Sequence, residues 1–156
     1  MLSWVTLIFA YPSPTAAAAT PMIGRIVIPA IRLDVLFTNG QAPTDTAFGP
    51  SHYPWTAMPG QGRTVAIAGH RVTHTHPFLR LNELRYGDLV EIRFGPAPTF
   101  PKEACYRVRH MHVVRPTNVG VTRDTGYDRL VLTTCHPPRT AIHRLVVTAR
   151  RAACVA

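Results

Sequence analysis

The stretch LVLTTCHPP at residues 130–138 constrains the fold of this chain more than any other. Aliphatic and β-branched residues fill it up to Cys135, which is typical of a buried β-strand. Pro137 and Pro138 follow, and proline offers no backbone N–H to a sheet ladder. The strand is therefore predicted to end after His136, which leaves the Cys135 thiol at the rim of a sheet where a ligand can reach it.

Two further apolar runs place reactive groups at strand ends. Residues 64–69, TVAIAG, predict a strand buried on both faces, and His70 follows the glycine directly. Residues 145–147 predict a return strand that begins at Arg144. We therefore expect a thiol, an imidazole and a guanidinium around one cleft. A neighbouring cation favours the thiolate, and a guanidinium can bind an oxyanion.

Three segments together resemble the sortase family of cysteine transpeptidases: AGHR at 68–71, LTTC at 132–135, and Arg144. GPSHYP at 49–54, PFLRLNEL at 77–84 and CHP at 135–137 further resemble the class E sortases of actinobacteria. The resemblance implies an all-β fold, a single closed or nearly closed sortase-type β-barrel of about eight strands with one or two short helices. A papain-like hydrolase fits poorly, because its cysteine precedes its histidine and begins a helix.

The resemblance also implies roles for particular residues. Cys135 would be the nucleophile, His70 the general acid and base, and Arg144 the oxyanion ligand; Arg139 competes for the last role, but it lies in a Pro-rich loop. Further candidate residues for substrate or oxyanion binding are Thr133, Thr134, His52, Tyr53, Val119 and Val121. For His52 and Tyr53 a second interpretation stays open, in which they close the end of the barrel. His136 is expected to face away from Cys135.

A sortase would act on secreted proteins that carry a C-terminal Leu-x-x-Thr-Gly-like sorting signal, with Ala second in class E. It would cleave between Thr and Gly and join the product to an amine of a cell-wall precursor or a pilin. We expect no cofactor and no metal. His70, His74 and His76 form a weak zinc pattern, but the β-branched Val72 and Thr73 favour an extended loop over a ligand-aligning helix.

The chain of 156 residues is long enough for one domain. We expect a catalytic domain over residues 23–151 and a tail over 152–156. Residues 1–22 are apolar and then rich in Pro and Ala, which fits either a truncated signal peptide or anchor, or a disordered tail. The resemblance implies the first interpretation, with export to the extracytoplasmic face of the cell membrane and association with that membrane.

Seventeen Lys and Arg against eight Asp and Glu give a net charge of +9. Such a surface suits nucleic acid, anionic lipid or an anionic cell wall. The leading alternative to a sortase is therefore a small basic β-barrel that binds nucleic acid without catalysis. Its strands offer few aromatic residues for base stacking, so we expect no nucleic-acid partner.

The remaining expectations concern local structure. For Cys105 and Cys154 the sequence leaves two interpretations open, a disulfide between them or two unpaired residues, a small buried hydrophobe or a terminal thiol; it favours the unpaired state. Strands are expected at residues 24–29, 31–38 and 89–94, a helical turn near 44–48, a short helix over 78–84 and an exposed strand over 105–114.

Overall fold

The protein is described by a computed structural model, which covers residues 22–94 and 101–154. Eight strands run in chain order: Met22–Ile28 (β1), Leu33–Asn39 (β2), Ser51–His52 (β3), Thr64–Ala68 (β4), Leu89–Phe94 (β5), Glu103–Val114 (β6), Arg129–His136 (β7) and His143–Ala152 (β8). The helical segments are short: Pro43–Thr46 (α1) and the 3-10 turns Pro29–Ile31 (η1), Leu81–Glu83 (η2) and Val119–Thr122 (η3). Within the described residues, no helix is long and apolar enough to span a membrane.

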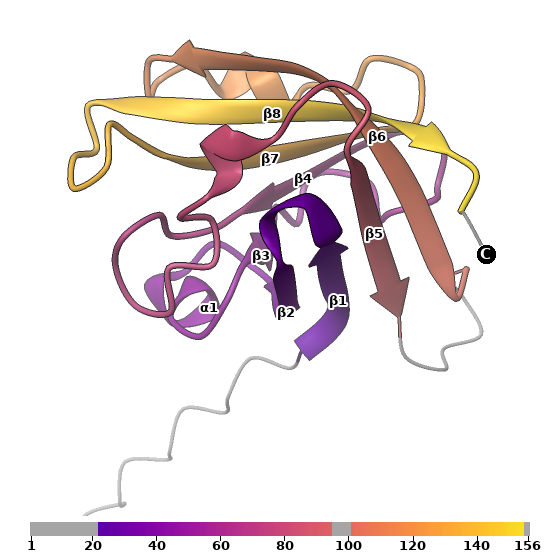
Figure 1. Cartoon of the computed structure of the whole chain (residues 1–156), viewed down its shortest axis with the longest axis horizontal. Coiled ribbons are helices and arrows are strands. Elements are labelled where there is room, and N and C mark those ends of the chain that lie inside the picture. The colour runs from indigo at the N-terminus through magenta and orange to yellow at the C-terminus, as the bar shows by residue number, and fades with distance from the viewer. Residues whose placement is uncertain (1–21, 95–100, 155–156) are drawn as a thin grey trace, which may run out of the picture.

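The strands close into a barrel in the order β1-β2-β3-β4-β7-β8-β6-β5, and β5 pairs back onto β1. This confirms the predicted all-β barrel. Two of the strand pairs, β2 with β3 and β4 with β7, are parallel, and the others are antiparallel. In Figure 1, β7 and β8 run side by side along the top of the barrel.

The continuous apolar pattern of β7 has a structural cause, because this strand is buried on both faces. Leu130 and Leu132 point into the main core, while Val131 on the opposite face joins a smaller cluster with Ala66 and Val146. Val121 and other partly buried apolar residues pack on that smaller cluster from outside. The loop between β6 and β7 therefore covers part of the outer face next to the predicted site.

Two local predictions were wrong. The apolar spacing at 78–84 yields turns and the single 3-10 turn η2 rather than a helix, although Phe78, Leu81 and Leu84 are all buried as the spacing requires. Strand β6 is not exposed along its length, since Tyr106 and Val108 are buried in its first half. A register shift between Val108 and His110 marks the point where the strand turns outward.

For the two cysteines outside the predicted site, the less favoured of the two interpretations is the correct one. Cys105 and Cys154 form a disulfide, with an S–S distance of 2.03 Å, which joins β6 to the segment after β8. Sequence spacing could not reveal it, because the two cysteines are brought together only by the pairing of β6 with β8.

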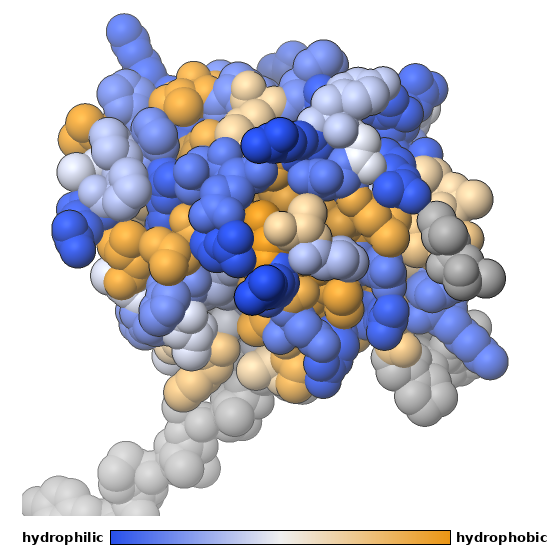
Figure 2. Space-filling view, viewed as in Figure 1, coloured by the Kyte–Doolittle hydropathy of each residue, from blue (hydrophilic) through white to orange (hydrophobic). Residues whose placement is uncertain are grey.

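Over the face shown in Figure 2, hydrophilic residues predominate and apolar residues appear in patches between them.

Candidate active site

Parallel pairing of β4 with β7 brings His70 and Cys135 to one edge of the barrel. The register pairs Ala68 with Thr133, and the Gly69 N–H extends the ladder by donating to the Thr133 carbonyl at 3.1 Å. Parallel strands end at the same edge of a sheet, so the residues that follow them meet there. Cys135 is the free cysteine of the described residues and is half-buried.

The third candidate residue arrives through the β7–β8 hairpin. Arg144 pairs directly with Cys135, and directly opposite residues on a sheet have Cβ atoms roughly 4.5–5.5 Å apart on one face. Its Nη1 donates to the carbonyl oxygens of Ala141 at 3.0 Å and His143 at 3.1 Å, which holds the guanidinium near the turn. Arg139, the competitor, is exposed in that turn with a positive φ of 65°.

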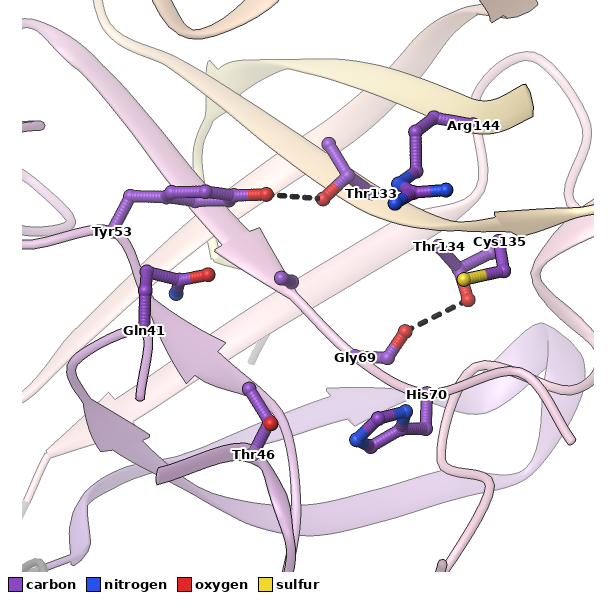
Figure 3. Close-up of a pocket in the computed structure, with 10 residues that line it drawn as sticks. Gln41, Thr46, Tyr53, Gly69, His70, Thr133, Thr134, Cys135 and Arg144 are labelled. Atoms are coloured by element: carbon purple, nitrogen blue, oxygen red, sulfur yellow. Dashed lines mark hydrogen bonds between the residues drawn. The ribbon is translucent and has the colours of Figure 1, made fainter. Parts of the chain in front are cut away.

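These side chains line one hollow of about 180 Å³. Figure 3 shows Cys135 between the His70 ring and the Arg144 guanidinium in this view. The residues that line the hollow are Gln41, Thr46, Tyr53, Ala68, Gly69, His70, Thr133, Thr134, Cys135 and Arg144. The structure therefore gathers the predicted thiol, imidazole and guanidinium around a single space.

The environment of His70 suits proton transfer near neutral pH. Its Nδ1 lies 3.0 Å from the Thr73 hydroxyl, and no hydrogen bond from a described residue engages its Nε2. The ring stacks on that of His74 with centroids 4.4 Å apart. Burial lowers the pKa of His70, and the neighbouring His74 lowers it further. A largely neutral imidazole at pH 7 can accept a proton.

Gly69 fixes the strand end that carries His70. A Cβ at this position would lie 2.7 Å from Cδ2 of Phe78, so the ring can pack here only against a glycine. The Phe78 N–H in turn donates to the His70 carbonyl at 3.0 Å. The loop between His70 and Phe78 is thus tied at its base to the core.

The two threonines before Cys135 have different surroundings. The Thr134 hydroxyl donates to the Gly69 carbonyl at 2.8 Å and so ties β7 to the end of β4. The Thr133 hydroxyl lies 3.1 Å from the Tyr53 hydroxyl (Figure 3). Thr134 therefore stabilises the site, while Thr133 and Tyr53 together form part of its wall.

The remaining candidates fall into two groups. Val119 and Val121 line a second hollow of about 70 Å³ that shares Tyr53 and Arg144 with the first. His52 lines neither hollow. It is 1% exposed, and its ring nitrogens lie 2.7 Å from Asn39 Oδ1 and 2.9 Å from the Ala57 carbonyl. His52 is therefore buried, and both of its ring nitrogens have partners within the protein.

Sequence reasoning missed the role of Arg71. Its side chain is 4% exposed, and Nη1 donates to His136 Nδ1 at 2.7 Å and to the Cys135 carbonyl at 3.3 Å. Its Nη2 donates to Asn82 Oδ1 at 2.8 Å, and its buried Nε has no partner. No carboxylate of the described residues forms an ion pair with it. A buried cation therefore lies directly behind the strand end of Cys135. In the sequence, the only sign of this role is the position of Arg71 next to His70.

The weak zinc pattern does not become a set of ligands. Among the described residues, the group of potential ligands near enough to share a metal ion is Glu103 with Cys105 and Cys154, and their two sulfur atoms are joined in the disulfide. His74 and His76 are exposed in the loop after His70.

Comparisons of the sequence with a family model and with a curated protein both find sortases. Residues 26–152 match the family model of the sortase domain. Sortase SrtE1 of Streptomyces coelicolor is 32% identical over 102 residues, which cover 59% of this chain and 28% of that protein. The matched part is therefore less than a third of the length of this curated relative.

Solved structures of sortases have a similar fold. A lid mutant of sortase A from Corynebacterium diphtheriae has a TM-score of 0.79 and 26% identity, with 88% of this chain and 74% of that chain covered. Sortase C-1 from Actinomyces oris has a TM-score of 0.77 and 27% identity, with 88% and 77% covered.

Proposed function

Because this chain belongs to the sortase family, we propose that it is a cysteine transpeptidase in which Cys135, His70 and Arg144 carry the reaction. The observation that carries the proposal is the meeting of these three side chains around one hollow, although His70 lies far from the other two in the chain. A thiol with an imidazole and a pre-aimed guanidinium is a nucleophile with a base and an oxyanion ligand.

The first half of the reaction forms a thioester. The Cys135 sulfur attacks a peptide carbonyl while its proton passes to Nε2 of His70, and the carbonyl oxygen becomes an oxyanion beside the Arg144 guanidinium. His70 then returns the proton to the nitrogen of the leaving amine, and the C–N bond breaks. Two of the Arg144 donors, Nε and Nη2, make no hydrogen bond with a described residue and are available to the oxyanion.

The second half transfers the acyl group. An incoming amine attacks the thioester carbonyl and loses a proton to His70, after which the Cys135 sulfur leaves and recovers a proton. The lowered pKa of His70 supports this role, since the imidazole must be neutral to accept the proton from the amine. Water in place of the amine would give hydrolysis, so the preference for an amine is part of the proposal.

For the substrate we propose a C-terminal sorting signal of the Leu-x-x-Thr-Gly kind, cleaved between Thr and Gly, on secreted proteins. The second hollow supports this, because it extends the first along Tyr53 and offers the apolar Val119 and Val121 to a peptide side chain. The acceptor would be an amine of a cell-wall precursor or of a pilin.

We propose that the protein acts outside the cytoplasm at the cell membrane. The Cys105–Cys154 disulfide supports this location, because disulfides persist in oxidising compartments and are rare in the cytosol. The likeness to sortases points in the same direction.

The test uses a quenched Leu-Ala-x-Thr-Gly peptide with an amine acceptor. Cys135→Ala should abolish turnover, His70→Ala should reduce it by several orders of magnitude, and mass spectrometry of the wild type should detect a thioester on Cys135. Arg139→Ala is the matched control for Arg144→Ala, because it removes an exposed arginine from the same hairpin turn. Turnover that survives Cys135→Ala would overturn the proposal.

A further inference from the structure

A third and larger hollow lies on the same outer face of the barrel, toward the other end of the β7–β8 pair. Its volume is about 360 Å³, and it is lined by Arg109, Arg129 and Arg150, with Tyr86, Tyr127 and Thr148 among its other walls. Arg129 pairs directly with Arg150, as Cys135 does with Arg144. The even spacing between these two pairs along both strands keeps all four side chains on one face.

The fold brings the guanidinium groups together in two ways. The antiparallel register sets Arg129 and Arg150 opposite each other, where like charges repel unless an anion lies between them. The register shift between Val108 and His110 leaves Arg109 as the extra residue of a bulge, and bulges re-aim side chains. Nothing in the reaction proposed above uses these arginines.

Two of the three arginines are held in place by tyrosine rings. The Arg109 guanidinium lies 5.1 Å from the centroid of the Tyr86 ring and donates to its hydroxyl, and its buried Nε has no partner. The Arg150 guanidinium lies 5.2 Å from the centroid of the Tyr127 ring. Such stacking orients the guanidinium plane and leaves its edge for a ligand.

Arg129 is fixed by hydrogen bonds instead. Its Nε donates to the Thr64 hydroxyl at 3.1 Å, and its Nη2 donates to the carbonyls of Val121 at 3.1 Å and Arg123 at 2.9 Å. Its Nη1 makes no hydrogen bond with a described residue. Pre-positioned donors of this kind lower the entropy that a ligand loses on binding.

No acidic residue of the described chain neutralises these three arginines. Five of the acidic side chains form ion pairs with other arginines: Asp34, Glu83, Glu91, Asp124 and Asp128. Asp45 and Asp88 accept backbone N–H groups in turns, and the Glu103 carboxylate lies beside the sulfur atoms of Cys105 and Cys154. Asp128 precedes Arg129 in the chain, but its carboxylate faces Arg151 and the Tyr106 hydroxyl.

We propose that this hollow binds the phosphate group of a small phosphate ester, either free or carried by a lipid headgroup. Guanidinium groups bind phosphate oxygens through paired N–H donors, and three of them around one space favour a compact, highly charged anion. The volume matches a headgroup-sized ligand. Single-stranded nucleic acid fits less well, because arginines already cover the Tyr86 and Tyr127 rings on which bases would stack.

Titration calorimetry at low salt tests the site with inorganic phosphate and glycerol 3-phosphate. Sedimentation with vesicles of phosphatidylglycerol, against vesicles of phosphatidylcholine, tests the lipid-borne form. The double variant Arg109→Gln/Arg150→Gln should raise the Kd for the phosphate probe at least tenfold. The matched control is Arg25→Gln/Arg93→Gln, which removes the same charge from exposed ion pairs elsewhere on the barrel and should leave Kd nearly unchanged.

Binding of the soluble esters identifies a free ligand, and binding of the phosphatidylglycerol vesicles alone identifies a lipid headgroup; either result supports the proposal if only the Arg109/Arg150 variant loses it. Equal loss in both variants, or no binding of any phosphate probe, would overturn it. So would binding of a single-stranded oligonucleotide through Arg109 and Arg150 without binding of the small esters. Thermal melts confirm folding, and peptide cleavage should be unaffected in both variants, which keeps this test separate from the transpeptidase proposal.

Discussion

The two ends of the β7–β8 pair share one backbone ladder and differ in what holds them. The end that carries Cys135 and Arg144 opens into a hollow, and its polar side chains are tied mainly to backbone carbonyls. The other end is cross-linked. Tyr106 donates to Asp128 at 3.0 Å and Arg151 lies 3.5 Å from the same carboxylate, while the disulfide lies nearby.

This difference separates chemistry from stability along one pair of strands. Cross-links at one end hold the register, so the other end can keep unsatisfied donors directed at a ligand without loss of the fold. Natural sites commonly accept local instability for the sake of function. Substitutions at the Cys135 end should therefore change activity, and substitutions of the cross-linking residues Tyr106, Cys105 and Cys154 should change the free energy of unfolding.

The largest effect is expected at the Cys135 end. Arg144→Gln removes a donor aimed at the oxyanion and should lower kcat about 100- to 1,000-fold. The free energy of unfolding should change by less than about 0.5 kcal/mol, because Arg144 is partly exposed and binds only turn carbonyls. Steady-state kinetics with chemical denaturation measures both. A large loss of stability with little loss of kcat would contradict the inference that the Cys135 end serves activity rather than stability.

The next effect belongs to the cross-linked end. Cys105→Ala/Cys154→Ala opens a disulfide that spans 49 residues, and should reduce the free energy of unfolding by about 2–4 kcal/mol. Activity at 25 °C should persist, since neither sulfur lines the hollow of Cys135. Denaturant titration of the double variant beside Cys154→Ala gives the measurement. An unchanged midpoint would mean that the disulfide does not hold this end.

Arg71 should affect the Cys135 end from behind. Arg71→Met removes hydrogen bonds to the Cys135 carbonyl and to His136, and we expect kcat to fall about 10- to 100-fold, because charge-assisted hydrogen bonds contribute about 1.5–3 kcal/mol. KM should hardly change, because Arg71 does not line the hollow. Arg71→Lys, which keeps the charge, should recover part of the activity. A rise in KM with normal kcat would show that Arg71 acts on binding instead.

A smaller effect is expected for Tyr106. Burial raises the pKa of its hydroxyl, and the Asp128 carboxylate raises it further, so the phenol stays protonated and donates. Tyr106→Phe leaves Asp128 and the Gly60 N–H without this partner and should cost about 1–2 kcal/mol of stability. Urea unfolding at neutral pH measures the loss. Turnover of the quenched peptide should match the wild type, and a fall in kcat would contradict the separation of the two ends.

The smallest effect is a pH dependence of stability. Burial lowers the pKa of both His52 and His70, so the unfolded chain binds more protons than the folded protein just below the ordinary histidine pKa of about 6.5. Stability should therefore be complete above that pH and decrease as the pH falls through it. Denaturant unfolding from pH 7.5 to 5.5 measures the slope, and His70→Gln should flatten it in part. A rising stability toward pH 5.5 would contradict the burial of these rings.

Much of the barrel follows from the sequence because strand signals are local. Alternation, apolar runs and proline placed β1, β2, β4, β5 and β7 close to their observed bounds. The predicted helix at 78–84 was wrong for a physical reason. The apolar spacing correctly predicted that three side chains are buried, but turns can bury the same side chains without forming a helix. His52 was ambiguous for the same reason, since an imidazole between turn residues can be buried or exposed.

By itself the sequence determined where strands stop and which reactive groups stand there, because proline, glycine and β-branched residues act over a few neighbours. It also indicated that Cys135 and Arg144 face each other, since a short hairpin sets its own register. Only the tertiary structure decided that β4 lies parallel beside β7, which delivers His70, and that Cys105 meets Cys154. Those contacts join residues far apart in the chain, and pairing between distant strands depends on the whole core.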